Sequence, residues 1–302
     1  METARARAFI ESAEAGSFKL AGDHLGYTPS GVSQLVTALE NDLGIRLLIR
    51  SKRGVELTVE GRKILPAAKA FVRREEDLYH LASELRGLTT GTLSIASYPS
   101  IATSWLPGVV RQFQAEYPGI QINIMEGIRS EIFGHIDNQD VDMGFLIYTE
   151  PMNYEWIPLA DDELIAVLPE NHRLANADAY PVEECLNDKV IMTSWGDDPD
   201  IEEIFKRNNV YPEIRLTTYD CPVALAMIQM GIGMSFMNRL STSRWNDHLV
   251  KLPLEPRHKI TFGIAIKSYD HLSSAAQKFL EATVRYLTKA EGDDSGNSFA
   301  IK

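Results

Sequence analysis

The chain has 302 residues, about twice the length of a typical domain, so two or three domains are expected. Hydrophobic residues make up 44% and charged residues 24%, which excludes a disordered chain, a collagen and a coiled-coil rod. The formal net charge of −12 is unevenly divided. Residues 1–90 carry 13 basic and 12 acidic residues, whereas residues 91–302 carry 17 and 30. The acidic total therefore does not exclude a nucleic-acid partner for the N-terminal part.

The sequence contains neither a readable membrane span nor a secretory signal. Its most apolar run, 221–237, is interrupted by Gln229 and two glycines, and about 20 apolar residues are needed to span a bilayer. The first residues lack the apolar stretch of a signal peptide, so a cytoplasmic protein without membrane contact is expected. Two cysteines, Cys185 and Cys221, are too few for a disulfide framework or a four-cysteine zinc site.

The first 45 residues predict three helices. Apolar residues recur at helical spacing over 4–15, 17–25 and 29–43. The third helix begins at Thr28-Pro29, a capping side chain followed by proline at the first helical position. Two helices joined by a short turn form a helix-turn-helix, whose second helix enters the major groove of DNA.

The face of the third helix that the core does not need carries short polar side chains. Such side chains near a helix N-terminus suit base edges and phosphates, and glutamine can bind adenine through two hydrogen bonds. Taken alone, a face of this kind is more often simply exposed to solvent. The candidate residues for DNA binding are Thr28, Pro29, Ser30, Ser33, Gln34 and Thr37.

The segment after the third helix predicts a β-hairpin with a basic tip. Residues 47–50 and 55–58 alternate as strands do on either side of the turn at 51–54. Four basic residues and no acidic one lie between positions 43 and 55. A basic turn behind a helix-turn-helix is typical of a wing that contacts phosphates. The candidate phosphate contacts are Arg50, Lys52 and Arg53.

A pattern of fixed spacing joins these segments over about sixty residues. It consists of Phe9, Ser17, Phe18, Ala21, Leu25, the run Thr28-Pro29-Ser30-Gly31-Val32-Ser33, Leu39, Glu40, Leu43, Gly44, Arg50, Leu57, Thr58 and Gly61. The pattern resembles the winged helix of the LysR-type transcriptional regulators. It departs from that family at Leu20 and at Leu48-Ile49, where the replacements are also apolar. The resemblance implies specific binding to double-stranded DNA and contact with RNA polymerase.

A long helix is predicted from about residue 59 to residue 87. Its heptad seam consists of Ile64, Ala68, Phe71, Glu75, Leu78, Ala82 and Leu85, at alternating steps of four and three residues. A helix between two domains has little core of its own to cover, so we expect a homodimer seam rather than packing on its own domain. Glu75 is then expected near Arg73 or Arg74 of the partner subunit, unless the seam opens there. The resemblance likewise implies dimers through this helix, often assembled as tetramers.

Beyond a polar hinge, strands and helices alternate to about residue 289, including short strands expected at 164–168 and 260–266. This alternation predicts an α/β fold with a mostly parallel sheet, following the all-α winged helix and linker. The motifs Gly91-x-Leu93-x-Ile95, Leu106-Pro107, Asp140-Val141-Asp142-Met143-Gly144 and Gly231-Ile232-Gly233-Met234 resemble the effector domain of the same family. That resemblance implies two lobes, like those of periplasmic binding proteins, around a ligand cleft. Asn238 stands where many members have proline.

The predicted domain organisation has four parts. They are a winged helix-turn-helix domain at 1–61, a linker helix and hinge at 62–90, an effector-binding domain at 91–290 and a disordered tail at 291–302. Within the effector-binding domain, lobe I is expected at about 91–160 and 268–290, and lobe II at about 161–267.

The candidate effector-binding residues follow strand ends, because ligands of such sheets bind beyond the carboxyl ends of the strands. Hydroxyl groups beside aromatic rings and an arginine suit a small organic acid. For each position alone, exposure in a loop is the alternative. The candidates are Ser97, Tyr98, Ser100, Ile101, Arg129, Tyr148, Thr193, Ser194 and Trp195.

No catalytic motif, phosphate loop, metal-ligand cluster or cofactor motif can be read, and the seven histidines are scattered. The leading prediction is therefore a DNA-binding regulator that responds to a small-molecule effector, is not an enzyme and has no metal or cofactor. Three alternatives stay open: a thiol-based redox-responsive regulator, a solute-binding protein without a DNA role, and an enzyme built on the two lobes. Acidic neighbours of Cys185 and Cys221 raise a thiol pKa, which disfavours redox sensing.

Overall fold

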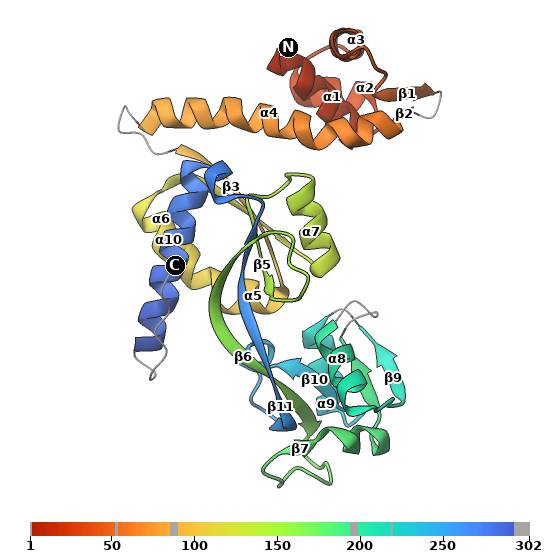
Figure 1. Ribbon diagram of the computed structural model, residues 1–302, viewed down its shortest axis with the longest axis vertical. Helices are drawn as coiled ribbons and strands as arrows, with labels where there is room; N and C mark the ends of the chain where they lie inside the picture. The colour runs from red at the N-terminus through yellow and green to blue at the C-terminus, as the bar shows by residue number, and fades with distance from the viewer. Residues whose placement is uncertain (1, 52–53, 85–89, 194–198, 219, 293–302) are drawn as a thin grey trace.

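A computed structural model of the chain describes residues 2–51, 54–84, 90–193, 199–218 and 220–292. It contains an N-terminal domain, a long helix and a two-lobed α/β domain (Figure 1). Among these ranges, no helix combines the length and apolar character needed to cross a bilayer. From residue 293 on, the predicted tail lies outside the described residues.

The N-terminal domain confirms the three predicted helices and the hairpin. Helix α3 begins where the sequence predicted, because the Thr28 hydroxyl accepts a hydrogen bond from the Gly31 amide (3.1 Å). Phe9, Val32 and Val36 are fully buried in the core between the helices. The elements are α1 (Thr3–Ala15), α2 (Phe18–Leu25), α3 (Pro29–Leu43), β1 (Leu48–Ser51) and β2 (Gly54–Leu57).

The hairpin is attached to α1 through a close backbone approach. The amide of Val55 donates a hydrogen bond to the carbonyl of Gly16 (2.9 Å). Gly54 has a φ of 131°, and a Cβ atom there would lie 2.4 Å from the same carbonyl oxygen. Only glycine fits this position, and the approach places the hairpin beside the helix-turn-helix.

Helix α4 (Val59–Glu84) is the predicted long helix, but the first part of its heptad seam packs on its own domain. Ala68 and Val72 are buried in the N-terminal core. Glu75 accepts hydrogen bonds from Thr3 (2.6 Å) and Arg7 (3.3 Å) of α1. It therefore contacts its own chain, and its predicted place near Arg73 or Arg74 of the partner subunit stays a prediction. The domain of the same chain already offers Glu75 a hydroxyl and a guanidinium.

Further along α4, large side chains at and beside the predicted seam are exposed rather than buried. Leu78 and Tyr79 are 65% and 68% exposed, although both are large apolar or aromatic side chains. Leu85, the last predicted seam residue, lies outside the described residues. The seam thus divides into a part buried within the chain and an exposed part.

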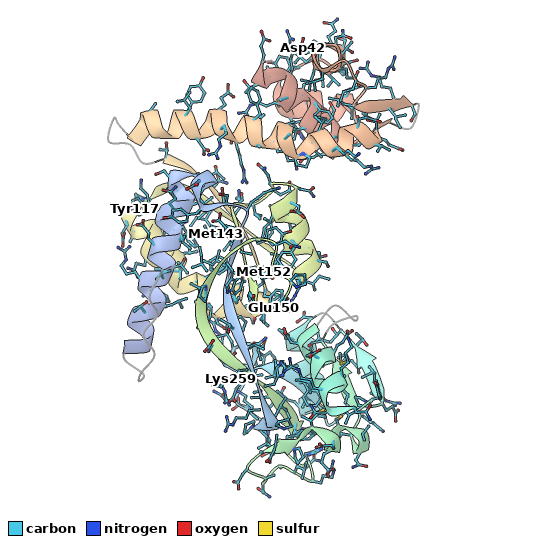
Figure 2. All side chains as sticks on the ribbon, viewed as in Figure 1. Asp42, Tyr117, Met143, Glu150, Met152 and Lys259 are labelled. Atoms are coloured by element: carbon cyan, nitrogen blue, oxygen red, sulfur yellow. The ribbon has the colours of Figure 1, made fainter. Side chains whose placement is uncertain are left out.

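Lobe I is built on a parallel core in which β3 lies between β4 and β5. The last helix returns to this lobe as predicted, because Phe279 packs edge-on against Phe113 with ring centroids 5.1 Å apart. Tyr117, labelled in Figure 2, packs beside Phe113 at 4.9 Å. The elements are β3 (Thr90–Ser97), α5 (Pro99–Ser104), α6 (Leu106–Glu116), β4 (Gly119–Glu126), α7 (Arg129–Asp137), β5 (Met143–Ile147), η3 (Tyr269–His271) and α10 (Ser274–Gly292).

Two long antiparallel strands, β6 (Glu155–Pro169) and β11 (Leu249–Ile266), run through both lobes (Figure 1). They replace the short strands predicted at 164–168 and 260–266, and they make the main sheet mixed rather than mostly parallel. The acidic run at 161–163 interrupts the apolar pattern of β6. In the structure these carboxylates are paired along the strand, so the strand continues through them.

Lobe II packs around the end of these two strands. Phe236 lies in its core, with ring centroids 5.9 Å from Tyr180 and 5.6 Å from Phe205. The chain passes between the lobes inside β6 and β11, so the predicted boundary at residue 161 falls within a strand. The elements are β7 (Tyr180–Pro181), η1 (Val182–Asn187), β8 (Val190–Met192), α8 (Pro199–Asn208), β9 (Ile214–Thr217), α9 (Cys221–Gln229), β10 (Ser235–Asn238) and η2 (Leu240–Thr242).

Candidate DNA-binding surface and effector cleft

The predicted DNA-binding residues of α3 and its cap share the outer face of the N-terminal domain. Thr28, Pro29, Ser30 and Gln34 are exposed, and Ser33 and Thr37 are half-buried. The opposite side of the helix packs into the core of the domain. Arg5 holds the far end of α3 against α1, because it donates to Asp42 (2.6 Å), which is labelled in Figure 2.

Arg50 of the hairpin lies folded onto this face. Its guanidinium donates to the hydroxyls of Ser33 (2.9 Å) and Thr37 (2.8 Å) and stands over the Phe18 ring, 5.3 Å from the centroid. Thr37 in turn donates to the Ser33 carbonyl (2.8 Å). Arg50 was predicted to contact phosphates, but in this structure its guanidinium orients two polar side chains of α3.

Glu40 links α3 to the hairpin and is 9% exposed. One carboxylate oxygen accepts from the amides of Leu47 (2.8 Å) and Leu48 (3.1 Å), and the other accepts from Arg50 (3.2 Å). A buried carboxylate with these partners fixes where the hairpin begins and where Arg50 points. From sequence, Glu40 was recognised only as part of the spacing pattern. Lys52 and Arg53 lie outside the described residues.

A cavity opens between the two lobes. Four of the nine predicted effector-binding residues line it: Tyr98, Ser100, Arg129 and Thr193. It also contains polar residues that are not among the nine predicted effector-binding residues. These are Asp200, Cys221, Asn238 and Ser241.

Three of the other predicted effector-binding residues, Ser97, Ile101 and Tyr148, do not line this cavity. Ser97 is buried and its hydroxyl donates to the Tyr98 carbonyl (3.0 Å), while Ile101 is buried in the core of lobe I. Tyr148 packs beside Trp156 with ring centroids 5.4 Å apart. At the end of a strand, the side chains of neighbouring residues point in opposite directions, so only some of them reach the cleft. Ser194 and Trp195 lie outside the described residues.

An ion pair crosses the cavity from lobe I to lobe II. Arg129, at the start of α7, is 8% exposed, and Asp200, in the first turn of α8, is 9% exposed. Nη2 of Arg129 lies 3.4 Å from Oδ2 of Asp200, and its Nε donates to the Tyr98 hydroxyl (3.2 Å). The partners are 71 residues apart, which explains why the sequence pattern showed only the arginine.

The rim of the cavity in lobe II is held by a side-chain amide. Oδ1 of Asn238 accepts from the amide (2.8 Å) and the hydroxyl (2.7 Å) of Ser241. Asp162 accepts from the amide of Leu240 (2.9 Å), and burial raises the pKa of this carboxyl. These bonds keep Ser241 directed at the cavity.

The two cysteines lie in different surroundings. Cys221 begins α9 and lines the cavity, whereas Cys185 is buried in the core. Burial, followed by the charge of Asp188, raises the pKa of Cys185 to about 11. A thiol with such a pKa is almost entirely protonated near pH 7 and therefore a poor nucleophile.

A winged helix-turn-helix joined by a long helix to a two-lobed binding domain defines a class of protein, the ligand-controlled DNA-binding regulator. Residues 4–62 match the family described as bacterial regulatory helix-turn-helix protein, lysR family. Residues 86–288 match the LysR substrate binding domain. The chain belongs to the LysR family of DNA-binding transcriptional regulators with an effector-binding domain.

Relatives and solved structures agree with this assignment over nearly the full length. The uncharacterized regulator YvbU of Bacillus subtilis is 28% identical, covering 93% of this chain and 97% of its own. A full-length OxyR variant of Pseudomonas aeruginosa shares the fold at a TM-score of 0.75 and 19% identity, covering 95% of this chain and 94% of its own. Full-length CbnR in complex with its target DNA has a TM-score of 0.65 and 20% identity, covering 95% and 100%.

Proposed function

We propose that this regulator recognises its operator through the exposed face of α3 and that the cavity between the lobes binds the effector. The observation that carries the first part is the contact of Arg50 with Ser33 and Thr37, which orients hydroxyls on the helix that enters the groove. Base contacts come from Pro29, Ser30, Ser33 and Gln34. Phosphate contacts come from the basic turn, with Lys52 and Arg53 at its tip.

The protein acts as a homodimer joined along α4, assembled further into a tetramer. The side chain of Leu78 supports this arrangement, because it belongs to the predicted heptad seam and is exposed in the single chain, as is its neighbour Tyr79. Paired winged helices then occupy successive major grooves of an imperfect dyad. Contact with RNA polymerase and a cytoplasmic location follow from the role in transcription.

The effector-binding domain communicates with the DNA-binding domain through α4. Lys69 forms ion pairs with Glu14 of α1 (2.6 Å) and with Asp140 of lobe I. Burial lowers the pKa of Lys69, but hydrogen bonds to Asp140 and Glu14 outweigh it and raise the pKa overall. Arg73 also approaches Asp142 of lobe I (3.4 Å). A change in lobe I therefore reaches α4 through two basic side chains, and Lys69 connects it directly to α1.

The effector is a small molecule held by Tyr98, Ser100, Arg129 and Thr193, with an organic acid as the expected class. Its binding changes the arrangement of the subunits to the extent that it prefers one arrangement over the other. A thiol-based response is disfavoured by the raised pKa of Cys185.

The experiment that tests this function is selection of random duplex DNA by the purified full-length chain. It is repeated with the double variant Ser33→Ala plus Gln34→Ala and with the control Asn41→Ala, at an exposed position near the end of α3. We expect an enriched dyad that the control retains and the double variant loses. Enrichment that survives in the double variant would refute the proposed base contacts, and a folded chain that enriches nothing, with or without cell metabolites, would refute the function.

A further inference from the structure

The cavity between the lobes has one charged group from each side. Among the described residues that line it, Arg129 and Asp200 carry the charges, and each is more than nine-tenths buried. We call them the lobe-bridging pair. Their charges cancel, so the cavity holds a neutral pair in a place where a single unpaired charge would be costly.

The pair is weakly bonded for a buried one. The distance from Nη2 of Arg129 to Oδ2 of Asp200 is 3.4 Å, whereas charge-assisted hydrogen bonds are usually about 2.7–2.9 Å long. Nε of Arg129 is used by the Tyr98 hydroxyl. A guanidinium can bind a carboxylate through two short, parallel hydrogen bonds, and the long contact with Asp200 falls short of that geometry.

The surroundings of Arg129 complete a site for a small carboxylate. Hydroxyl groups of Ser100, Thr193 and Ser241 line the same cavity and suit further oxygen atoms. Apolar walls, which suit the carbon part of a ligand, come from Ile128, Ile147, Leu164, Ile201 and Phe236. The start of α7 is not itself the anion site, because Glu131 already accepts the hydrogen bond of the Ile128 amide (2.9 Å).

A second carboxylate cannot simply join Asp200 on Arg129. Two like charges around one buried guanidinium leave a net negative charge, and their repulsion opposes binding. The ligand therefore has to replace the carboxylate that is already there. Since Asp200 belongs to lobe II and Arg129 to lobe I, that exchange removes an ion pair between the lobes.

We propose that the lobe-bridging pair is an internal competitor for the effector, which is a small carboxylate that displaces Asp200 from Arg129 and thereby changes how the lobes are joined. This inference rests on the proposed function of the cavity and adds the means of regulation. Without ligand, Asp200 keeps Arg129 neutralised and the lobes connected. With ligand, the carboxylate takes two short hydrogen bonds from the guanidinium, and Asp200 returns to water.

The first test needs no ligand. Hydrogen exchange of the full-length chain is measured for wild type, Asp200→Asn, Arg129→Gln and the control Asp220→Asn. Asp220 lines the adjoining part of the cleft and precedes α9, so the control removes a negative charge without touching Arg129. We expect faster exchange in the first turns of α7 and α8 for the two variants of the pair. Exchange equal to that of wild type and control in both helices would refute the connection between the lobes.

The second test uses acetate and benzoate as probes, with acetamide and benzamide as uncharged matches. The shift in unfolding temperature is titrated at constant ionic strength set by sodium chloride. We expect both carboxylates to stabilise wild type, the amides to have no effect, and Arg129→Gln to abolish the shift. Asp200→Asn should lower the apparent Kd by about tenfold, whereas Asp220→Asn should change it by less than about twofold.

The two variants of the pair are expected to change carboxylate binding in opposite directions, because Asp200→Asn strengthens it and Arg129→Gln abolishes it. A purely structural role of the pair would not produce opposite effects. If the pair only supports the fold, Asp200→Asn and Arg129→Gln weaken binding alike, and the inference is wrong. Equal shifts with acids and amides, or no carboxylate shift in wild type and Asp200→Asn, would also overturn it. These assays do not involve DNA, so their failure leaves the DNA selection result untouched, and each proposal can fail separately.

Discussion

The surface of α3 and the cavity between the lobes each depend on an arginine paired with a buried carboxylate, Glu40 beside α3 and Asp200 in the cavity. On α3, Glu40 and Arg50 lie within 18 residues of Ser33, so one helix and the following hairpin supply the whole network. In the cavity, Arg129 and Asp200 come from two lobes. The difference shows that a local network follows from helix and turn spacing, whereas a long-range pair depends on how the chain crosses between lobes.

The largest effect is expected at Glu40, where the local network is most buried. Glu40→Ala leaves the amides of Leu47 and Leu48 without their acceptor and should lower the free energy of unfolding by about 2–4 kcal/mol. Glu56→Ala, in the exposed part of the hairpin, should change it by less than about 0.5 kcal/mol. Urea unfolding measures both, and equal losses would show that Glu40 is not the link between α3 and the hairpin.

The next effect concerns DNA recognition. Arg50→Lys keeps the charge, but a single ammonium cannot replace the two-pronged contact with Ser33 and Thr37. We expect affinity for the selected operator to fall by about 10- to 100-fold, with a smaller loss for random DNA. Titration of both duplexes at one salt concentration measures this, and Arg46→Lys, at an exposed position, serves as the control. Equal losses on operator and random DNA would mean that Arg50 acts as a phosphate contact only.

A smaller effect is expected at the rim of the cavity, where the network is also local. Asn238→Ala removes the acceptor of two hydrogen bonds from Ser241 and should destabilise the protein by about 1–2 kcal/mol. Asn187→Ala, in an exposed pair with Glu184, should cost less than about 0.5 kcal/mol. Urea unfolding and the benzoate titration are measured together. An unchanged stability for Asn238→Ala would show that Ser241 is held by the backbone alone.

The smallest effect is a pH dependence at Glu75, the contact between α4 and α1. The Thr3 hydroxyl, and then Arg7, hold the pKa of this carboxyl below its ordinary value of 4.5. Glu75 therefore stabilises the folded state above pH 4.5, and this contribution is lost as the pH falls through the lowered pKa. Glu75→Gln should make the acid side of the stability profile less steep, and Thr3→Val should do so in part. A profile as steep as that of wild type in Glu75→Gln would contradict the contact.

Interpretation of the sequence succeeded where structure depends on neighbours along the chain. Thr28-Pro29 marked the start of α3, and the polar face of α3 was recognised from helical spacing alone. Glu75 shows the limit, because the heptad pattern could not distinguish a partner subunit from the α1 helix of the same chain. The same holds for β6, which was predicted only at 164–168, whereas the strand in the structure begins at Glu155 and includes the acidic residues at 161–163.

The amino-acid sequence by itself determined the three N-terminal helices, the long α4, the alternation of strands and helices, and the family to which the chain belongs. Helix caps, helical periodicity and turn residues act over a few neighbouring positions, so they can be recognised from the sequence alone. Only the tertiary structure decided that Glu75 meets α1, that β6 and β11 run through both lobes, and that Asp200 meets Arg129. These contacts join segments brought together by the packing of whole elements, and no local pattern encodes which charge will face which.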